Sequence, residues 1–256
     1  MKITSCFSRG LPATRRLVMR RPAFTRVELL ACILAFAGLG LLVRPALGAS
    51  ASRSRLTQCF NNLRQVGAGF QSWAMSNGDK FPWQVRKADG GLNGSSLSGN
   101  PFIHFAIISN ELVTPRVLVC PSDSGKKPAS DFGASSAGGI LHNNFQNLAV
   151  SYMVGLHGAP DLPQQILSGD RHLKVSGIQH CAIVGVTAMA LTPNDTPIAW
   201  TNLHNATGNL LFSDGSVLTL SSSGLRQAIL GAAPPVSGSS PQTHVLVPGY
   251  PPTLPE

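Results

Sequence analysis

The chain has 256 residues, of which 43% are hydrophobic and only 12% are charged, and its formal net charge is +9. A chain of this length can hold one sizeable domain or two small ones, and the many glycines and prolines indicate a loop-rich globular body beside an apolar segment. Most of the basic excess lies in residues 1–23, which carry six lysines and arginines and no acid. Without those six, the basic residues exceed the 11 acidic ones by three, and no basic stripe alternates with aromatics. We therefore do not expect the body to bind nucleic acid.

An apolar segment follows the basic leader, and residues 29–43 contain no charge. This run is short for a membrane span of about 20 residues, and it matches the apolar region of a secretory signal peptide. Small residues follow at Ala46 and Gly48. One interpretation is therefore a signal peptide cut by signal peptidase near Gly48, which releases a secreted periplasmic binding domain.

Glu28 favours a different interpretation of the same segment. A carboxylate at the head of an apolar segment is costly to desolvate, unless a positive charge meets it in the same low-dielectric layer. Cleavage between Ala23 and Phe24 would supply that charge, because it creates an α-amino group four residues before Glu28. In a helical assembly, this amine can meet Glu28 of a neighbouring subunit.

Past Pro45, apolar residues recur at steps of three and four and predict an amphipathic helix that ends near Gly78. Together with the apolar segment, it predicts one long N-terminal helix over residues 24–78, suited to membrane in its first half and to packing on a head in its second. Three aromatic residues cluster around its end: Trp73, Phe81 and Trp83. They predict the contact between helix and head, with a carbohydrate- or protein-binding surface as the alternative.

Residues 79–232 predict a globular α+β head. A short helix is expected at 102–113. Short strands are expected at 149–156, 164–170 and 180–186. Two apolar strands flank Asp214-Gly215 in "GNLLFSDGSVLTL", which predicts a type I′ hairpin.

The end of the chain predicts one more helix and then a tail. The stretch "SSGLRQAIL" predicts a small helix with a serine cap and Gly231 as its stop. Residues 233–256 are rich in proline and polar residues. We expect an irregular tail there.

The cysteines leave their pairing open. Cys59, Cys120 and Cys181 lie in the body. In an exported protein Cys59 and Cys120 could form a disulfide, and three buried free thiols are the alternative. The sequence has no C-x-x-C motif and no Cys/His zinc spacing, so no metal site is expected.

His204 and Asp214 are candidate site residues, because histidine and aspartate can form a catalytic or metal-binding pair. Asp214-Gly215 already has a structural role as the expected turn, and a histidine before the strand can hydrogen-bond the loop that leads into it. We expect that structural role, with a cation site or catalysis as alternatives. Asp170-Arg171, at a strand end, is expected to form an ion pair that fixes a loop.

Neither an enzyme motif nor a calcium loop is evident. The chain lacks G-x-S-x-G and D-x-[DN]-x-D. We expect no catalytic activity and no cofactor. The alternative to the absence of a cofactor is a calcium ion held by loop oxygens. The aspartates that could supply such oxygens are scattered: Asp123, Asp131, Asp161 and Asp195.

The N-terminus resembles type IV pilins and type II secretion pseudopilins, with their prepilin-type cleavage and methylation motif. A basic leader precedes a small residue, then Phe-Thr-x-x-Glu and an apolar helix, here from Ala23 through Phe24 to Glu28. The chain departs from the pattern twice, since Ala23 stands where glycine is usual and Arg26 where an apolar residue is usual.

The body resembles a bacterial group of pseudopilin-like proteins whose signature is a histidine, nine residues and Asp-Gly. Here these are His204 and Asp214-Gly215. Four further stretches match the group: "C-x-NNLRQ-x-G" at 59–67, "GDKFPW" at 78–83, "SNELVTPK-x-LVCPSD" at 109–123, with Arg116 in place of the lysine, and "LSGDR" at 167–171. The resemblance runs from about residue 20 to 230.

The resemblance implies a non-enzymatic structural subunit with a pilin-like α+β fold, in which a long N-terminal helix packs on a small antiparallel sheet head. It implies cleavage by a prepilin peptidase between Ala23 and Phe24, methylation of Phe24, and assembly through Glu28 with other pseudopilin subunits. The expected location is the inner membrane, crossed once, with a periplasmic head. The resemblance gives no role for the His and Asp-Gly signature.

Overall fold

The computed structural model describes residues 25–174, 179–183, 186–191, 198–201, 203–232 and 243–249, with side chains left out at 39–51 and 179–188. The expected leader, residues 1–23, and Phe24 lie outside the described residues. The chain divides into two compact units, residues 1–48 and 49–256. Each is described by itself below.

The described residues form an α+β structure with an antiparallel sheet, which confirms the expected fold class at this level. The strands are β1 (Tyr152–Gly155), β2 (Ile166–Asp170), β3 (Leu173–Lys174), β4 (Gln179–Ile183), β5 (Val186–Leu191), β6 (Ala199–Trp200), β7 (Thr207–Phe212), β8 (Val217–Ser221) and β9 (Thr243–Leu246). Within the described ranges, seven strands pair in the order β4-β5-β9-β1-β2-β7-β8, while β3 pairs with β6 separately. Each of these pairings is antiparallel.

The helices are α1 (Arg26–Ser76), α2 (Pro101–Ala106) and α3 (Ser222–Ala232), with short 3-10 turns η1 (Lys87–Asp89), η2 (Pro115–Leu118) and η3 (Gln146–Ala149). Helix α2 is shorter than the expected 102–113, because the chain continues as turns that still bury Ile108 and Leu112. Both side chains pack against Gly69 of α1, where a Cβ would lie 2.9 Å from a Leu112 methyl carbon. The absence of a side chain at Gly69 therefore allows this close contact.

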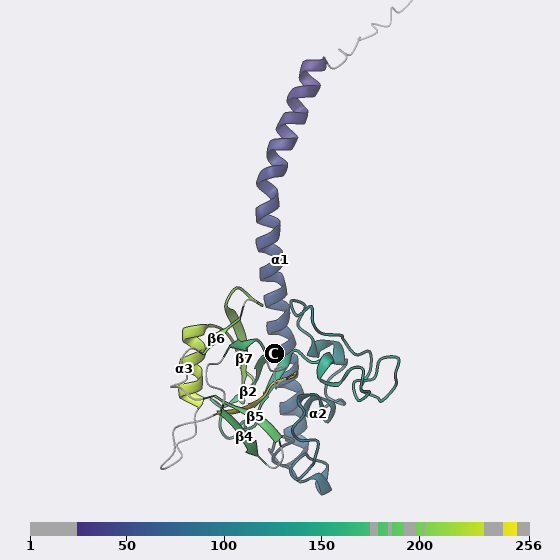
Figure 1. The fold of residues 1–256 in the computed structure, drawn as a ribbon, viewed down its shortest axis with the longest axis vertical. Helices are drawn as coiled ribbons and strands as arrows, with labels where there is room; N and C mark the ends of the chain where they lie inside the picture. Colours follow the sequence, from purple (N-terminus) through teal and green to yellow (C-terminus); the bar gives the residue numbers. More distant parts are fainter. Residues whose placement is uncertain are drawn as a thin grey trace, which may run out of the picture. The chain divides into compact units, whose positions relative to one another are not determined.

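The part of α1 that belongs to the second unit packs as its apolar spacing predicts. Its buried side chains recur once per turn, at Cys59, Leu63, Val66, Phe70 and Trp73. They share one core with residues of α2 and of the main sheet, which lie on either side of this part of α1 (Figure 1). The helix ends one residue before Asn77-Gly78, and Gly78 has the positive φ of 67° that suits a stop.

The aromatic cluster at the end of α1 forms the predicted contact between helix and head. Phe70 meets the ring of Phe81 at 6.0 Å and that of Trp83 at 5.6 Å, both edge to face. The Trp83 indole Nε1 donates to the Gly158 carbonyl at 3.0 Å. Trp73 and Phe81 are buried, so the alternative of an exposed binding surface is wrong for these two rings, while Trp83 is half-buried.

Two expectations near the end of the chain are corrected. The single strand expected at 180–186 is two strands, since β4 ends at Ile183 and the antiparallel β5 begins at Val186. The tail expected to be irregular from residue 233 contains β9, which pairs with both β5 and β1 inside the sheet. A strand of only four residues is stabilised by hydrogen bonds to the strands on both sides. The proline-rich sequence around it gives no sign of these partners.

Helix α3 follows its sequence pattern closely. The Ser221 Oγ accepts a hydrogen bond from the Gly224 backbone N–H at 3.3 Å, so the cap is a serine, one residue before the stretch in which it was expected. The helix runs one residue past the expected stop at Gly231, to Ala232. Buried Leu225, Ile229 and Ala232 hold this last turn against the second core of the sheet.

In the first unit, the described side chains of α1 expose a series of large apolar residues. They are 55–76% exposed: Val27, Leu29, Leu30, Ile33, Leu34 and Phe36. Among the described residues, no helix is long and apolar enough to cross a membrane.

Candidate functional site

The signature residues lie at opposite ends of one strand. His204 precedes β7 and Asp214-Gly215 follows it. Six strand residues span about 20 Å at the usual rise per residue, so His204 and Asp214 cannot share one ligand. The alternatives of a catalytic or cation-binding pair of these two residues are therefore wrong.

The Asp-Gly end forms a tight turn, but not of the predicted type. The Phe212 N–H donates to the Ser216 carbonyl and the Gly215 N–H donates to the Phe212 carbonyl, both at 2.9 Å. Gly215 has a φ of 83°, whereas Asp214 is not among the residues with positive φ. This is a three-residue loop, a type I turn followed by a left-handed glycine, because a type I′ turn needs two positive φ angles.

This turn docks on helix α1. The Gln71 Nε2 donates to the Ser213 carbonyl at 2.6 Å. One turn of helix earlier, a Cβ at Gly67 would lie 2.7 Å from a Leu211 methyl carbon and 3.7 Å from the Gly215 Cα. The Asp-Gly turn therefore fixes the β7–β8 hairpin to α1, which is a structural role.

The histidine end of the signature is held by a second turn. Thr207 donates to the His204 carbonyl through its backbone N–H at 3.2 Å and its Oγ1 at 2.6 Å. The two residues between them, Asn205 and Ala206, have φ of 54° and 60°, so the type I′ form occurs here. A left-handed conformation costs an L-residue such as Ala206 about 1–2 kcal/mol. The turn thus fixes the direction from which His204 enters the core.

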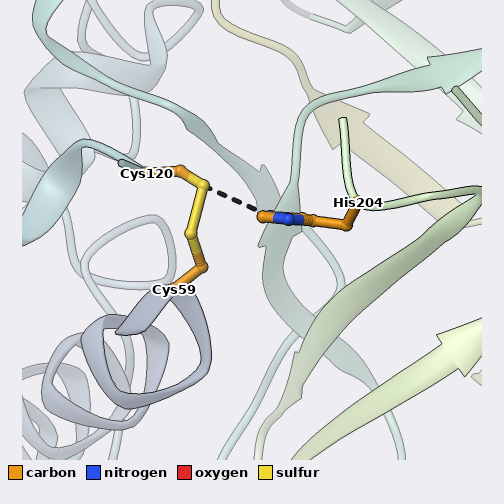
Figure 2. Close-up of side chains that lie close together, drawn as sticks. All are labelled: Cys59, Cys120 and His204. Atoms are coloured by element: carbon orange, nitrogen blue, oxygen red, sulfur yellow. Dashed lines mark hydrogen bonds between the residues drawn. A yellow bond between two sulfur atoms is a disulfide. The ribbon is translucent and has the colours of Figure 1, made fainter. Parts of the chain in front are cut away.

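His204 contacts a disulfide. Cys59 of α1 and Cys120, which follows η2, are joined with their Cα atoms 5.2 Å apart, so the disulfide alternative is confirmed for these two. Figure 2 shows the His204 ring pointing at this bridge, and its Nε2 lies 3.3 Å from the Cys120 Sγ. All three side chains are buried. The two ends of the signature therefore both lie against the second half of α1.

Cys59, Cys120 and His204 also form a group of metal-type ligands. Their ligand atoms all lie within 4.8 Å of one another. This group is not visible in the sequence, because Cys120 is 61 residues from Cys59 and 84 residues from His204, far from any zinc spacing. While the disulfide is intact, neither sulfur can act as a thiolate ligand.

A buried carboxylate, Asp170, lies beside the group. Its Oδ2 is 3.9 Å from the His204 Nε2 and accepts the Asn209 backbone N–H at 2.7 Å. Burial raises the pKa of Asp170 to about 7, although the Asn209 hydrogen bonds oppose the shift. Burial also lowers the pKa of His204. The two residues therefore tend towards their neutral forms at neutral pH.

The expected ion pair between Asp170 and Arg171 is wrong. Arg171 pairs with Asp123 instead. Its Nε and Nη2 donate to the two Asp123 oxygens at 2.7 and 2.9 Å. Neighbouring residues at a strand end point to opposite sides, which separates Asp170 from Arg171. Burial alone would raise the pKa of Asp123, but His172 and Arg171 outweigh it and hold the pKa below its usual range.

Of the aspartates considered for calcium, Asp123 and Asp131 already have partners among the described residues. The Asp123 carboxylate is occupied by Arg171, and Asp131 accepts the Gly133 N–H at 2.7 Å. Asp195 lies outside the described residues.

At the other end of the chain, Glu28 has a local partner. Thr25 donates to the Glu28 Oε2 through its backbone N–H at 2.8 Å and its hydroxyl at 3.0 Å. The Glu28 N–H donates back to the Thr25 Oγ1 at 3.3 Å. This is a capping box at the start of α1. The Thr-x-x-Glu spacing of this cap is visible in the sequence, and it gives Glu28 a role besides the expected ion pair.

A pocket of about 270 Å³ opens beside His204. Its lining comes from α1 and from the turn after His204: Ser52, Arg53, Leu56, Asn205 and Thr207. His204 adjoins this pocket, while its side chain is only 1% exposed.

No protein-family model matches the chain, and neither a curated protein nor a solved structure matches it.

Proposed function

We propose that this protein is a pseudopilin-like structural subunit of a type II secretion or type IV pilus-like assembly. A prepilin peptidase cleaves it between Ala23 and Phe24. The protein is not an enzyme. The first part of a long N-terminal helix anchors it in the inner membrane. The second part of this helix packs on a periplasmic head with an antiparallel sheet.

The exposed apolar surface at the start of α1 carries this proposal. Six large apolar side chains between Val27 and Phe36 are 55–76% exposed. Exposure of such a contiguous apolar surface to water is unfavourable by about 25 cal/mol per Å², so lipid or neighbouring helices are expected to cover it. The sequence in front of it has the order of a prepilin leader: basic residues, Ala23, Phe24 and Glu28.

The capping box supports a helix that begins at the expected cut. Thr25 is its cap, so cleavage before Phe24 would leave only one residue ahead of the helix cap. The cap uses the Glu28 Oε2. The other oxygen of this carboxylate can still accept the α-amino group of a neighbouring subunit, so the cap and the intersubunit ion pair are compatible.

Two substitutions separate these roles of Glu28. Glu28→Gln keeps an acceptor for the capping box but removes the charge, whereas Glu28→Ala removes both. We expect both variants to be cleaved and both to be incorporated about tenfold less, which corresponds to the loss of roughly 1.4 kcal/mol of pairing. Incorporation is measured as the fraction of subunit that crosslinks to its neighbours in membranes.

Glu111→Gln, in the head, is the matched control and should be incorporated normally. If Glu28→Gln is incorporated to the same extent as the unmodified chain, the capping box alone is sufficient and the proposal of an intersubunit ion pair is wrong.

A second candidate function is a secreted periplasmic binding domain, released by signal peptidase near Gly48. The observation in its favour is that the first compact unit ends at Gly48 and the second begins at Ala49. A pocket of about 390 Å³ between β8 and α3 would then be its binding site. The first residue of the mature protein distinguishes this candidate from the pseudopilin-like subunit.

A further inference from the structure

We propose that reduction of the Cys59–Cys120 disulfide creates a site for Zn²⁺, with the two sulfurs and the His204 Nε2 as ligands. This site is separate from the assembly function proposed above and does not depend on how the N-terminus is processed. It gives His204 a second role besides packing.

The distances suit tetrahedral zinc. Zn–S bonds of about 2.3 Å and Zn–N bonds of about 2.0–2.1 Å place ligand atoms about 3.4–3.8 Å apart. The His204 Nε2 is already 3.3 Å from the Cys120 Sγ, and all three ligand atoms lie within 4.8 Å of one another. Once the bond between the sulfurs is broken, they can separate to this spacing with a small movement.

The chemistry of the ligands selects the ion. Two thiolates and one neutral imidazole form a set that zinc prefers. Zn²⁺ with two thiolates carries no net charge, which suits a buried site.

A pocket of about 270 Å³ adjoins His204 on the side of the turn that follows it, so an ion has only a short way to travel from the surface. Three protein ligands leave a fourth, open position, which a water molecule can take. The turn at Asn205 and Ala206, with both residues at positive φ, connects His204 to β7 and fixes its backbone.

The reaction is balanced by an external dithiol. Two electrons and two protons pass from the dithiol to the disulfide, the bond between the sulfurs breaks, and the dithiol becomes a disulfide. Zn²⁺ then displaces the two thiol protons. Zinc therefore binds only the reduced chain, and its binding favours the reduced form.

The test uses the full chain in detergent, with Cys6, Cys32 and Cys181 changed to serine so that no other thiol takes part. The protein is reduced with a phosphine and titrated with Co²⁺, whose thiolate charge-transfer and tetrahedral d–d absorption report the ligand set. Zn²⁺ is then added in competition. We expect one Co²⁺ per reduced chain, its displacement by Zn²⁺, and no signal from the oxidised chain.

Ligand variants decide the assignment. His204→Ala should weaken binding by more than the roughly 10–100-fold that outer-shell partners contribute, and Cys120→Ser should abolish the charge-transfer band. His142→Ala, which changes a histidine outside the group, should bind normally. Absence of thiolate–cobalt absorption in the reduced chain, or unchanged binding by His204→Ala, would overturn the proposal.

Loss of structure on reduction is followed by circular dichroism in the same samples. If the reduced chain unfolds, Zn²⁺ should restore the folded signal, since metal binding and folding are coupled. A reduced chain that stays unfolded with Zn²⁺ present also contradicts the site.

Discussion

Asp170 is a buried carboxylate with few compensating partners. Its Oδ2 accepts hydrogen bonds from Asn209, while its Oδ1 has no partner among the described residues. His204, 3.9 Å away, has its pKa lowered by burial and does not supply a positive charge at neutral pH. The charged form of Asp170 is therefore destabilising in the folded protein.

Asp170→Asn tests this at the residue scale. The folded-state pKa is raised from 3.8 to about 7, so the folded chain holds the proton more tightly than the unfolded chain. The stability that Asp170 contributes is complete below about pH 4 and is lost as the pH rises through about 7. Asparagine does not titrate in this range. The free energy of unfolding of Asp170→Asn, relative to that of the unmodified chain, should therefore increase by about 1–3 kcal/mol from about pH 5 to about pH 8.

The measurement is the free energy of unfolding in urea at both pH values. Asp161→Asn, at an exposed position, is the control and should show no such change. An Asp170→Asn difference that is the same at both pH values would show that the carboxyl does not titrate in this range.

At the scale of elements, the β7–β8 hairpin is attached to α1 through its turn. Gln71→Ala removes the 2.6 Å hydrogen bond that the Gln71 Nε2 donates to the Ser213 carbonyl. We expect a loss of about 1 kcal/mol in the free energy of unfolding. Gln65→Ala, at an exposed position of the same helix, should change it by less than about 0.5 kcal/mol. Equal effects of the two substitutions would contradict the docking role of the turn.

Strand β9 lies inside the main sheet, although an irregular tail was expected at its position. It pairs with β5 on one side and β1 on the other, and Val245 and Leu246 are buried. A chain that ends after residue 242 should therefore lose cooperative unfolding, measured by circular dichroism during heating. A chain that ends after Gly249 keeps the strand and should unfold cooperatively. Cooperative unfolding of the shorter chain would mean that the sheet forms without β9.

The elements that the sequence predicted well have strong local patterns. The second half of α1 shows one buried residue per turn, and the α3 cap is a single serine. The type of the Asp214-Gly215 turn was predicted wrongly, because this dipeptide suits two hairpin turns that both place glycine at positive φ. Strand β9 was missed because its stability comes from two partner strands rather than from its own four residues.

The candidate site was less predictable than the fold. Cys59, Cys120 and His204 come from a helix, a loop and a turn that only the tertiary structure brings together. The partner of Arg171 was predicted wrongly, because Asp123 is 48 residues away in sequence. The capping role of Glu28 could have been predicted, since a Thr-x-x-Glu spacing before an apolar helix is a known cap pattern.

At the scale of the whole molecule, the account assigns one function to each of two units. The first unit carries the exposed apolar side chains of α1, and the second carries the sheet, the disulfide and both ends of the His and Asp-Gly signature. In the proposed assembly, the first unit supplies the membrane and intersubunit contacts. The second then supplies the periplasmic surface.

The identity of the first residue of the mature protein tests this account most directly. The protein is purified from the membranes of the cells that make it, and its N-terminus is determined by sequencing and by intact mass. The account predicts a chain that begins at Phe24, with the added mass of a methyl group on its α-amino nitrogen. A mature chain that begins at Ala49 would contradict it and establish a secreted domain instead.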